Sequence, residues 1–328
     1  MSTTTVARPG FWSRVPLLRE LRQSVGWQRG MLIAGLVIIV VFLLTAALAP
    51  WLAPFGFDQL RDEGGTFGAQ LPPNPQHLLG TTVGGYDVLS RVIWGSQTAV
   101  LVIVIAVLLS IFAGVLLGLV SGYFGGWLDR VLVVVCDAIY AFPSLLLAIV
   151  MSIVLSGGKS SLFFGILAAA ISITVVFIPQ YFRVIRSETV RIKAEAFVES
   201  AKVIGASNAR VMFRHVLRNS TRTLPLILTL NASEAILTLA GLGFLGFGIE
   251  PTSAAEWGFD LNKSISDVAA GIWWTSIFPG TAIVLVVLGI TLVGESLNDL
   301  ADPRLRTRHR ALATSAAPAE VDKLEEAL

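Results

Sequence analysis

Three carboxylates stand inside long apolar segments of this sequence, where an ionisable side chain is costly and usually has a function. They are Asp137, Glu234 and Glu295. Acids in such places bind a substrate or an ion, carry protons in a relay, or pair with a polar group on a neighbouring helix. Each of the three is alone in its segment, which does not make a relay. We weigh interhelical pairing above a role in binding along a pathway.

No motif for hydrolysis or metal binding accompanies these acids. The sequence has no GxxxxGK[ST] phosphate loop, no GxSxG elbow and no HExxH motif. Its three histidines are scattered, and the single Cys136 rules out an internal disulfide. We expect a non-catalytic chain without a metal site or a bound cofactor of its own. Energy for active transport must then come from a separate subunit or from an ion gradient.

The longest polar segment between apolar blocks runs from Arg183 to Arg222 and carries nine Lys or Arg against three acids. Its pattern predicts a helix over Ile192–Ile204, a break at Gly205, and a second helix over Asn208–Leu217 that Ser207 caps. The first helix and its end carry an apolar stripe, formed by Ala196, Val198, Ala201, Val203 and Ile204. A stripe of this kind needs a partner groove, so we favour a docking element over a solvated charged loop.

The elements that position these residues are membrane spans. The 328 residues are 54% hydrophobic and 14% charged, whereas soluble domains average about 25% charged residues. Each of six apolar segments is long enough to cross a hydrocarbon core of about 30 Å. They lie at about Met31–Ala49, Gln97–Ser121, Val131–Leu155, Leu162–Phe182, Leu224–Ile249 and Ile272–Leu297.

The distribution of Lys and Arg predicts the orientation. With the N terminus inside, the inner segments hold 20 of the 24 Lys and Arg residues and the outer segments hold 4, as the positive-inside rule requires. Both termini are therefore expected to be cytoplasmic. The predicted units are a basic, amphipathic segment at 1–29, a first span at 30–49, an extracytoplasmic loop at 50–96, a transmembrane core at 97–298 with its cytoplasmic loop at 183–222, and a cytoplasmic, disordered tail at 299–328.

A glycine-rich run ends the fifth predicted span. Its glycines allow two backbones to approach closely, so they indicate either helix packing or a gate. They are Gly241, Gly243, Gly246 and Gly248.

Several motifs resemble a known family. The run Glu199–Ser200–Ala201, then Gly205 and Phe213–Asn219, resembles the EAA loop of permease subunits of bacterial ABC importers. Ser200 stands for the middle Ala of that loop, and Arg218 stands where the family usually has Pro. The runs His77–Thr81 and Asp87–Arg91 are similar to a signature of the C-type permease subunits of dipeptide, oligopeptide and nickel importers.

The resemblance extends in register over about residues 75–306. It implies an all-α, type I importer permease (MetI-like) bundle of six helices in the bacterial cell membrane. The partners implied are a homologous permease subunit, two ATPase subunits that hold ATP-Mg, and an extracytoplasmic solute-binding protein. The loop would couple to an ATPase through Glu199, Ser200, Ala201, Gly205, Ala206, Arg210 and Arg214.

Import of di- or oligopeptides is the function that these motifs favour. A nickel, metal-chelate or other small-solute importer shares the same motifs and stays open. A secondary transporter driven by an ion gradient is the alternative from another class; the inverted repeats and broken half-helices typical of that class are not evident in the sequence.

Overall fold

The computed structural model describes residues 27–156 and 162–301 of the chain. Most of them are helical, which confirms the predicted all-α membrane bundle. The expected amphipathic N-terminal segment and the expected tail lie almost entirely outside the described residues. The long helices are α2 (Trp27–Ala47), α4 (Val88–Phe124), α5 (Gly126–Ala141), α6 (Ser144–Ser156), α7 (Leu162–Lys193), α11 (Leu224–Phe244) and α14 (Trp274–Ala301).

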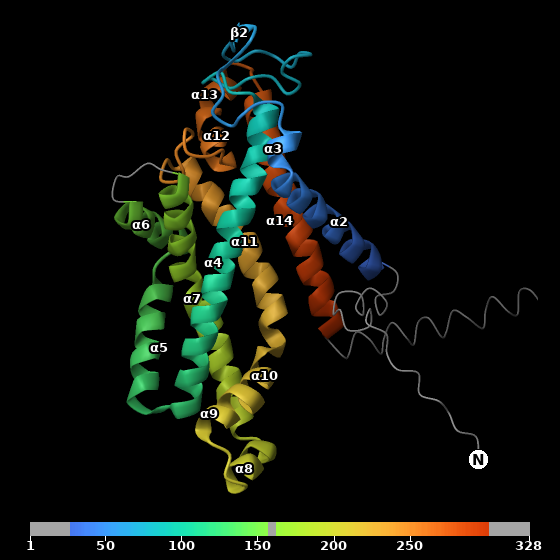
Figure 1. Ribbon diagram of the computed structural model, residues 1–328. Coiled ribbons are helices and arrows are strands. Elements are labelled where there is room, and N and C mark those ends of the chain that lie inside the picture. The colour runs from blue at the N-terminus through green and yellow to red at the C-terminus, as the bar shows by residue number, and fades with distance from the viewer. Residues whose placement is uncertain (1–26, 157–161, 302–328) are drawn as a thin grey trace, which may run out of the picture.

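Short elements gather at the two ends of the bundle (Figure 1). One end, called the α12 end, carries α3 (Ala49–Leu52), the antiparallel pair β1 (Arg61–Asp62) and β2 (Gly65–Thr66), α12 (Trp257–Lys263) and α13 (Ile265–Ala269). The other end, called the α8 end, carries α8 (Ala196–Val203), α9 (Asn208–Arg210), the π-helix η2 (Val211–Val216), α10 (Leu217–Ser220) and the 3₁₀-helix η3 (Thr221–Thr223).

Five described helices are long and apolar enough to cross a membrane, and a bent pair, α5 with α6, makes up to six spans. The third predicted span is therefore wrong as a single helix, because α5 and α6 meet at 98°. Phe142 ends α5 in an extended conformation (ψ 139°) just before Pro143. A residue that precedes proline is disfavoured in helical conformation by the proline ring, so this dipeptide produces the bend.

The other predicted spans also differ from the structure at their ends; the fourth, for example, continues to Lys193 rather than ending at Phe182. The second begins at Val88 rather than at Gln97, because the side chain of Asp87 caps α4 by accepting a hydrogen bond from the Ser90 N–H at 2.7 Å. The fifth ends at Phe244 rather than at Ile249. Pro179 and Pro279 lie inside α7 and α14 without ending them.

A close helix contact joins α4 to α7 along three glycines spaced four residues apart. A Cβ atom at Gly114 would lie 2.5 Å from the Cβ of Tyr181, and one at Gly118 would lie 2.7 Å from the carbonyl oxygen of Phe182. At Gly122 it would lie 2.8 Å from the carbonyl oxygen of Arg186. Small residues at this spacing let two membrane helices pack with their backbones in contact.

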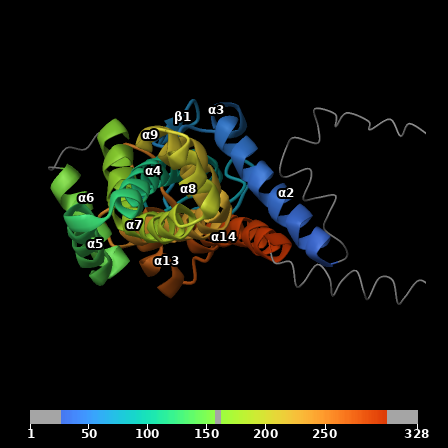
Figure 2. The same cartoon turned by 90° about the horizontal axis from the view of Figure 1, so that it is seen from below.

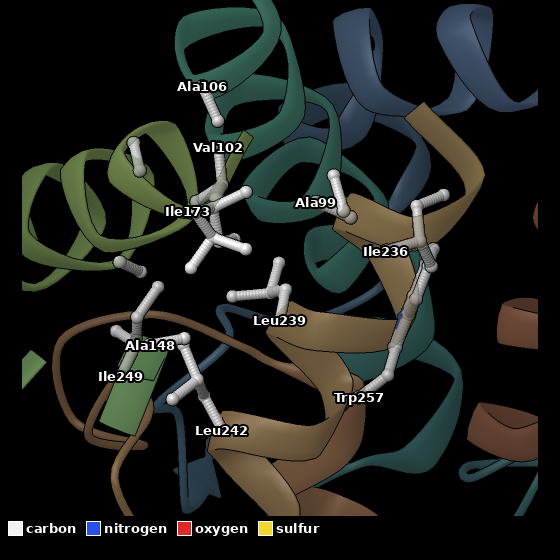
Figure 3. Close-up of a cluster of buried hydrophobic side chains, with 14 of the residues drawn as sticks. Ala99, Val102, Ala106, Ala148, Ile173, Ile236, Leu239, Leu242, Ile249 and Trp257 are labelled. Atoms are coloured by element: carbon white, nitrogen blue, oxygen red, sulfur yellow. The ribbon is translucent and has the colours of Figure 1, made fainter. Parts of the chain in front are cut away.

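The apolar core lies where α4, α7, α11 and α6 meet, and Figure 3 shows its side chains pointing at one another. Val102 from α4, Ile173 from α7 and Leu239 from α11 are buried at its centre. Trp257 closes the cluster towards the α12 end and donates from its indole N–H to the carbonyl of Val92 at 3.1 Å. Seen from the α8 end, α2 and α14 form one side of the bundle and α5 and α6 form the opposite side (Figure 2).

Buried charges fasten the α12 end to α4. The Nε of Arg91 donates to the Asp260 carboxylate at 2.7 and 2.9 Å, across 169 residues of sequence. Its Nη1 donates to the carbonyl of Phe57 at 3.0 Å. Nearby, the imidazole of His77 lies 3.0 Å from the carboxylate of Asp87. Removing one member of a buried pair leaves the other charge unpaired, which is strongly destabilising. These contacts therefore hold the segment before α4 against the helices.

We predict that Gly118→Ala destabilises the bundle by about 1–3 kcal/mol, the usual cost of an extra methyl group in a packed interior. The reason is the contact with the Phe182 backbone, which cannot move without separating α4 from α7. Thermal denaturation of the purified protein in detergent measures the effect. Gly280→Ala is the matched control, since its Cβ would meet only Leu261, at 3.7 Å; equal melting temperatures for both variants would contradict the packing account.

Candidate functional site

The predicted docking element is a compact projection at the α8 end, called the knob and defined as residues 194–216 (Figure 1). The chain reaches it through α7, which continues as one helix to Lys193. The single helix predicted over Ile192–Ile204 is wrong at its start: the chain breaks at Ala194, and Glu195 flanks α8 in an extended conformation (ψ 143°). α8 is therefore an independent short helix rather than an extension of α7.

The predicted break at Gly205 and the predicted cap at Ser207 are both confirmed. Gly205 has φ +89°, and its N–H donates to the carbonyl of Lys202 at 2.9 Å. The next N–H, of Ala206, reaches back to the carbonyl of Ala201 at 3.0 Å. This pair of bonds is the Schellman motif, which favours glycine at the left-handed position. The hydroxyl of Ser207 then accepts from the Arg210 N–H at the start of α9.

Beyond Ser207 the helix does not turn back before the fifth span. Residues Asn208 to Phe244 form one helical path of 37 residues, which passes through the π-helix η2 and the 3₁₀-helix η3. Arg218, which replaces the family's usual proline, lies inside this path, and Pro225 stands in the first turn of α11, directly after η3. The knob is thus held between two membrane helices, α7 and α11.

The predicted apolar stripe divides into a buried part and an exposed part. Val198 is fully buried against residues of α4 and α7, and Ala201 packs against the same cluster. Val203 and Ile204, in contrast, are 83% and 86% exposed at the tip of the knob. Five members of the predicted coupling set are exposed, on α8, at the turn after it, and on α9 and η2. They are Glu199, Ser200, Gly205, Arg210 and Arg214.

Tyr123, at the end of α4, joins the bundle to the knob and was missed by sequence reasoning. It is 4% exposed, and its hydroxyl donates to the side-chain oxygen of Asn208 at 3.0 Å. The ammonium groups of Lys193 and Lys202 lie 5.7 and 5.6 Å from its ring centroid, within the range of a cation–π contact. The signal in the sequence was an aromatic residue in a Gly-rich turn, Gly122–Gly126.

A charged pair next to Tyr123 fixes the α8 end of three helices. Arg186 of α7 donates from Nε and Nη2 to the two carboxylate oxygens of Asp129 in α5, the latter at 2.7 Å. Ser121 of α4 donates to the same carboxylate. This bidentate geometry is the strongest form of ion pair between side chains, and it ties α4, α5 and α7 together where the knob begins.

The structure does not bring the three membrane-depth acids together. Asp137 on α5 accepts from Arg183 on α7 at 2.8 Å, and that guanidinium lies 4.1 Å from the ring centroid of Tyr140. Glu234 on α11 lines a cavity of about 220 Å³ between α5, α6, α7 and α11. Glu295 is exposed on α14. Asp137 thus has an interhelical partner, and Glu234 is the acid that faces a cavity.

The glycine run forms the turn that ends α11. Gly246 has φ +82° in a second Schellman motif, in which the Phe247 N–H donates to the Leu242 carbonyl at 2.8 Å. A Cβ at Gly241 would touch Leu145 of α6 at 3.0 Å, and one at Gly248 would lie 2.6 Å from the Cα of Gly243. These contacts are packing contacts, and a role as a gate stays a prediction.

Gly243 also makes room for a buried acid. A Cβ at this position would overlap the carboxylate of Glu256. That carboxylate caps α12 by accepting from the Gly258 and Phe259 N–H groups at 2.8 and 2.7 Å. Burial raises the pKa of Glu256 to about 8, although the two N–H donors act to lower it.

Two protein-family models match this chain. The model of a family described as "Binding-protein-dependent transport system inner membrane component" matches residues 114–307, from the glycine contact of α4 through the knob and beyond α14. The chain belongs to this family. A second model, "N-terminal TM domain of oligopeptide transport permease C", matches residues 28–73 of the permease. The permease is accordingly a multi-pass inner membrane protein.

Individual relatives cover nearly the whole permease. The dipeptide transport system permease protein DppC of Haemophilus influenzae is 39% identical over 85% of this chain and 92% of its own. DppC of Alkalihalophilus pseudofirmus is 34% identical over 84% of this chain and 86% of its own. The glutathione transport system permease protein GsiD of Pectobacterium atrosepticum is 32% identical over 90% of this chain and 91% of its own.

We predict that the stability of the permease falls as pH rises from about 4.5 to about 8 because of Glu256. The unfolded carboxyl, with a pKa of 4.5, loses its proton in this range while the folded one keeps it. The stabilisation is complete below the unfolded pKa and is lost as pH passes the folded pKa. The slope is at most about 1.4 kcal/mol per pH unit. Melting temperatures across this range test it: Glu256→Gln should flatten the dependence, and exposed Glu250→Gln should not. A wild-type slope in Glu256→Gln would refute the assignment.

Proposed function

We propose that this permease is one subunit of an ATP-driven importer of di- or oligopeptides and forms half of its translocation pathway. The support comes from its relatives, which are named for dipeptide and glutathione transport. Both solutes are short peptides. A second, homologous permease subunit would complete the pathway, and an extracytoplasmic solute-binding protein would deliver the peptide to the α12 end.

Two ATPase subunits would supply the energy. The sequence has no phosphate-binding loop, so ATP-Mg would be bound and hydrolysed on those subunits and not by this chain. The α8 end would face the cytoplasm, because ten of the fourteen Lys and Arg residues in the described ranges belong to Arg130 and the segment 183–222. The same orientation would place both termini in the cytoplasm.

The exposed tip of the knob carries the argument for coupling. Val203 and Ile204 are more than four-fifths exposed beside Gly205, and apolar side chains held out of both membrane and core indicate a protein interface. Arg210 and Arg214 make no ion pair within the described ranges 27–156 and 162–301. They would meet acids around an ATPase groove, while Glu199 would meet a cation.

The cavity at Glu234 is the best candidate for a part of the pathway. It also exposes Tyr140 and Gln180, so an acid, an amide and a phenol ring face one space of about 220 Å³. These groups suit the ammonium and amide groups of a short peptide. The bend between α5 and α6 forms one wall of this cavity through Phe142 and Ser144.

The test uses the complete importer, reconstituted in liposomes with its binding protein. Uptake of labelled dipeptides should require ATP and should persist when the proton gradient is collapsed. Uptake of nickel in place of dipeptides would favour the metal-chelate alternative. Uptake without ATP that stops with the gradient would show a secondary transporter.

Gly205→Val should separate ATP hydrolysis from uptake in this assay. Valine at φ +89° costs at least about 1–2 kcal/mol of backbone strain. This cost lowers the fraction of molecules that keep the native turn at position 205 about tenfold. Uptake per ATP hydrolysed should therefore fall about tenfold, while the amount of protein in the membrane stays unchanged. Gly205→Asn is the control of similar size, because asparagine tolerates the left-handed region. Equal coupling in both variants would contradict the role of the turn.

A further inference from the structure

A long apolar groove runs along the outside of α4 towards the knob. Its volume is about 580 Å³. One wall is formed by Phe112, Leu116 and Leu119 of α4, and the other by Phe213 and Leu217 of η2 and α10. Phe112 is 69% exposed, so the described residues leave this groove uncovered. We call it the α4–α10 groove.

One cation lines this otherwise apolar space. Arg218 belongs to its lining, and no acid does. The guanidinium makes no hydrogen bond or ion pair with any residue in the described part of the chain, whereas Arg222, one turn further on, donates to the Asn219 side chain at 2.9 Å. Thr221, the other polar residue of the groove, donates its hydroxyl to the carbonyl of Arg218. The chain itself thus supplies no counter-ion for Arg218.

The groove lies beside residues 111–119 of α4, in the half of this helix nearer the α8 end. Leu116 stands eight residues before the end of α4 at Phe124, which is about 12 Å along the helix axis. Arg218 faces this same stretch of α4. The Arg218 guanidinium stands beside apolar side chains of a helix that is long and apolar enough to span a membrane, where an anion or access to the headgroups stabilises a cation. It binds phosphate with a fork of N–H donors.

We propose that the α4–α10 groove binds an anionic phospholipid, whose phosphate lies at Arg218 and whose acyl chain lies along α4. Basic pockets between membrane helices bind acidic lipid headgroups in this way. The inference does not depend on which solute the importer carries. It assigns a role to the residue that replaces the family's usual proline.

A helix of the partner subunit fits the groove less well. A partner helix would have to place an acidic side chain at Arg218, because no acid of this chain lines the groove. A flexible hydrocarbon chain fills a narrow groove along its whole length and presents no backbone polar groups. The charge at one end and the apolar walls elsewhere match a lipid.

The experiment uses the complete importer in nanodiscs of phosphatidylethanolamine and phosphatidylglycerol, followed by native mass spectrometry. The wild type should retain phosphatidylglycerol in preference to phosphatidylethanolamine. Arg218→Gln should lower that preference about fivefold, the effect of one Arg near an anionic headgroup, and Arg218→Lys should keep most of it. Arg222→Gln removes the same charge outside the groove and should leave the preference unchanged.

A second pair of variants tests the groove itself. Leu116→Trp fills it and should reduce the number of retained lipids, whereas Leu108→Trp, at a site that is 61% exposed and outside the groove, should not. Three results would overturn the proposal. They are an unchanged preference in Arg218→Gln, equal retention of both lipids by the wild type, or lipid bound to the isolated chain but absent from the complete importer, which would show that the partner fills the groove.

Discussion

The backbone contact between α4 and α7 is the constraint on which the rest of this structure depends. Three glycines of α4, at 114, 118 and 122, lie against α7 so closely that any side chain there would meet main-chain or Cβ atoms. Without a hydrophobic drive between helices in lipid, such close packing is a main source of association. Because both helices are long, this one contact positions both ends of the molecule. At the α12 end it places Arg91, and at the α8 end it places Tyr123.

Continuity of the helices explains how the knob can act on the membrane part. α7 enters the knob without a break before Ala194, and one helical path leaves it from Asn208 to Phe244. Val198 and Tyr123 fix the knob to the bundle, so a force on its tip is carried by rigid elements rather than by a loop. The path that leaves the knob carries Glu234 at the middle of α11 and ends at the Gly243–Glu256 contact. In the function proposed above, this path links the ATPase side to the cavity.

Much of this arrangement follows from the sequence, because local patterns specify it. The break at Gly205 and the cap at Ser207 depend on the conformational preferences of single residues, and the structure confirms them. Apolar length predicted six spans, and the described residues form five continuous candidate spans and the bent pair α5–α6. The Phe142–Pro143 dipeptide also indicates the bend, because proline disfavours helical conformation in the residue before it. The prediction of one straight span rested on apolar length alone. The GxxxGxxxG spacing in α4 was present in the sequence and its packing role was overlooked.

Pairings between distant segments could not be predicted in the same way. Arg91 and Asp260 are 169 residues apart, and the local sequence around either residue does not identify the other as its partner. The division of the knob's apolar stripe depends on where α4 and α7 stand beside it, so only the packed structure shows that Val198 is buried and Ile204 is exposed. The cavity at Glu234 likewise arises from four helices together. The roles of these residues in coupling and in the pathway stay predictions.

Contact between the tip of the knob and an ATPase subunit is the central claim, and site-directed cross-linking measures it most directly. In a Cys136→Ser background, Ile204→Cys at the tip is compared with Val268→Cys at the α12 end, a site that is 53% exposed. A short maleimide reagent that also reacts with lysine is applied to the assembled importer. The account predicts a covalent product with an ATPase subunit from Ile204→Cys and none from Val268→Cys. A product from Val268→Cys, or none from Ile204→Cys despite full labelling of the free thiol, would contradict it.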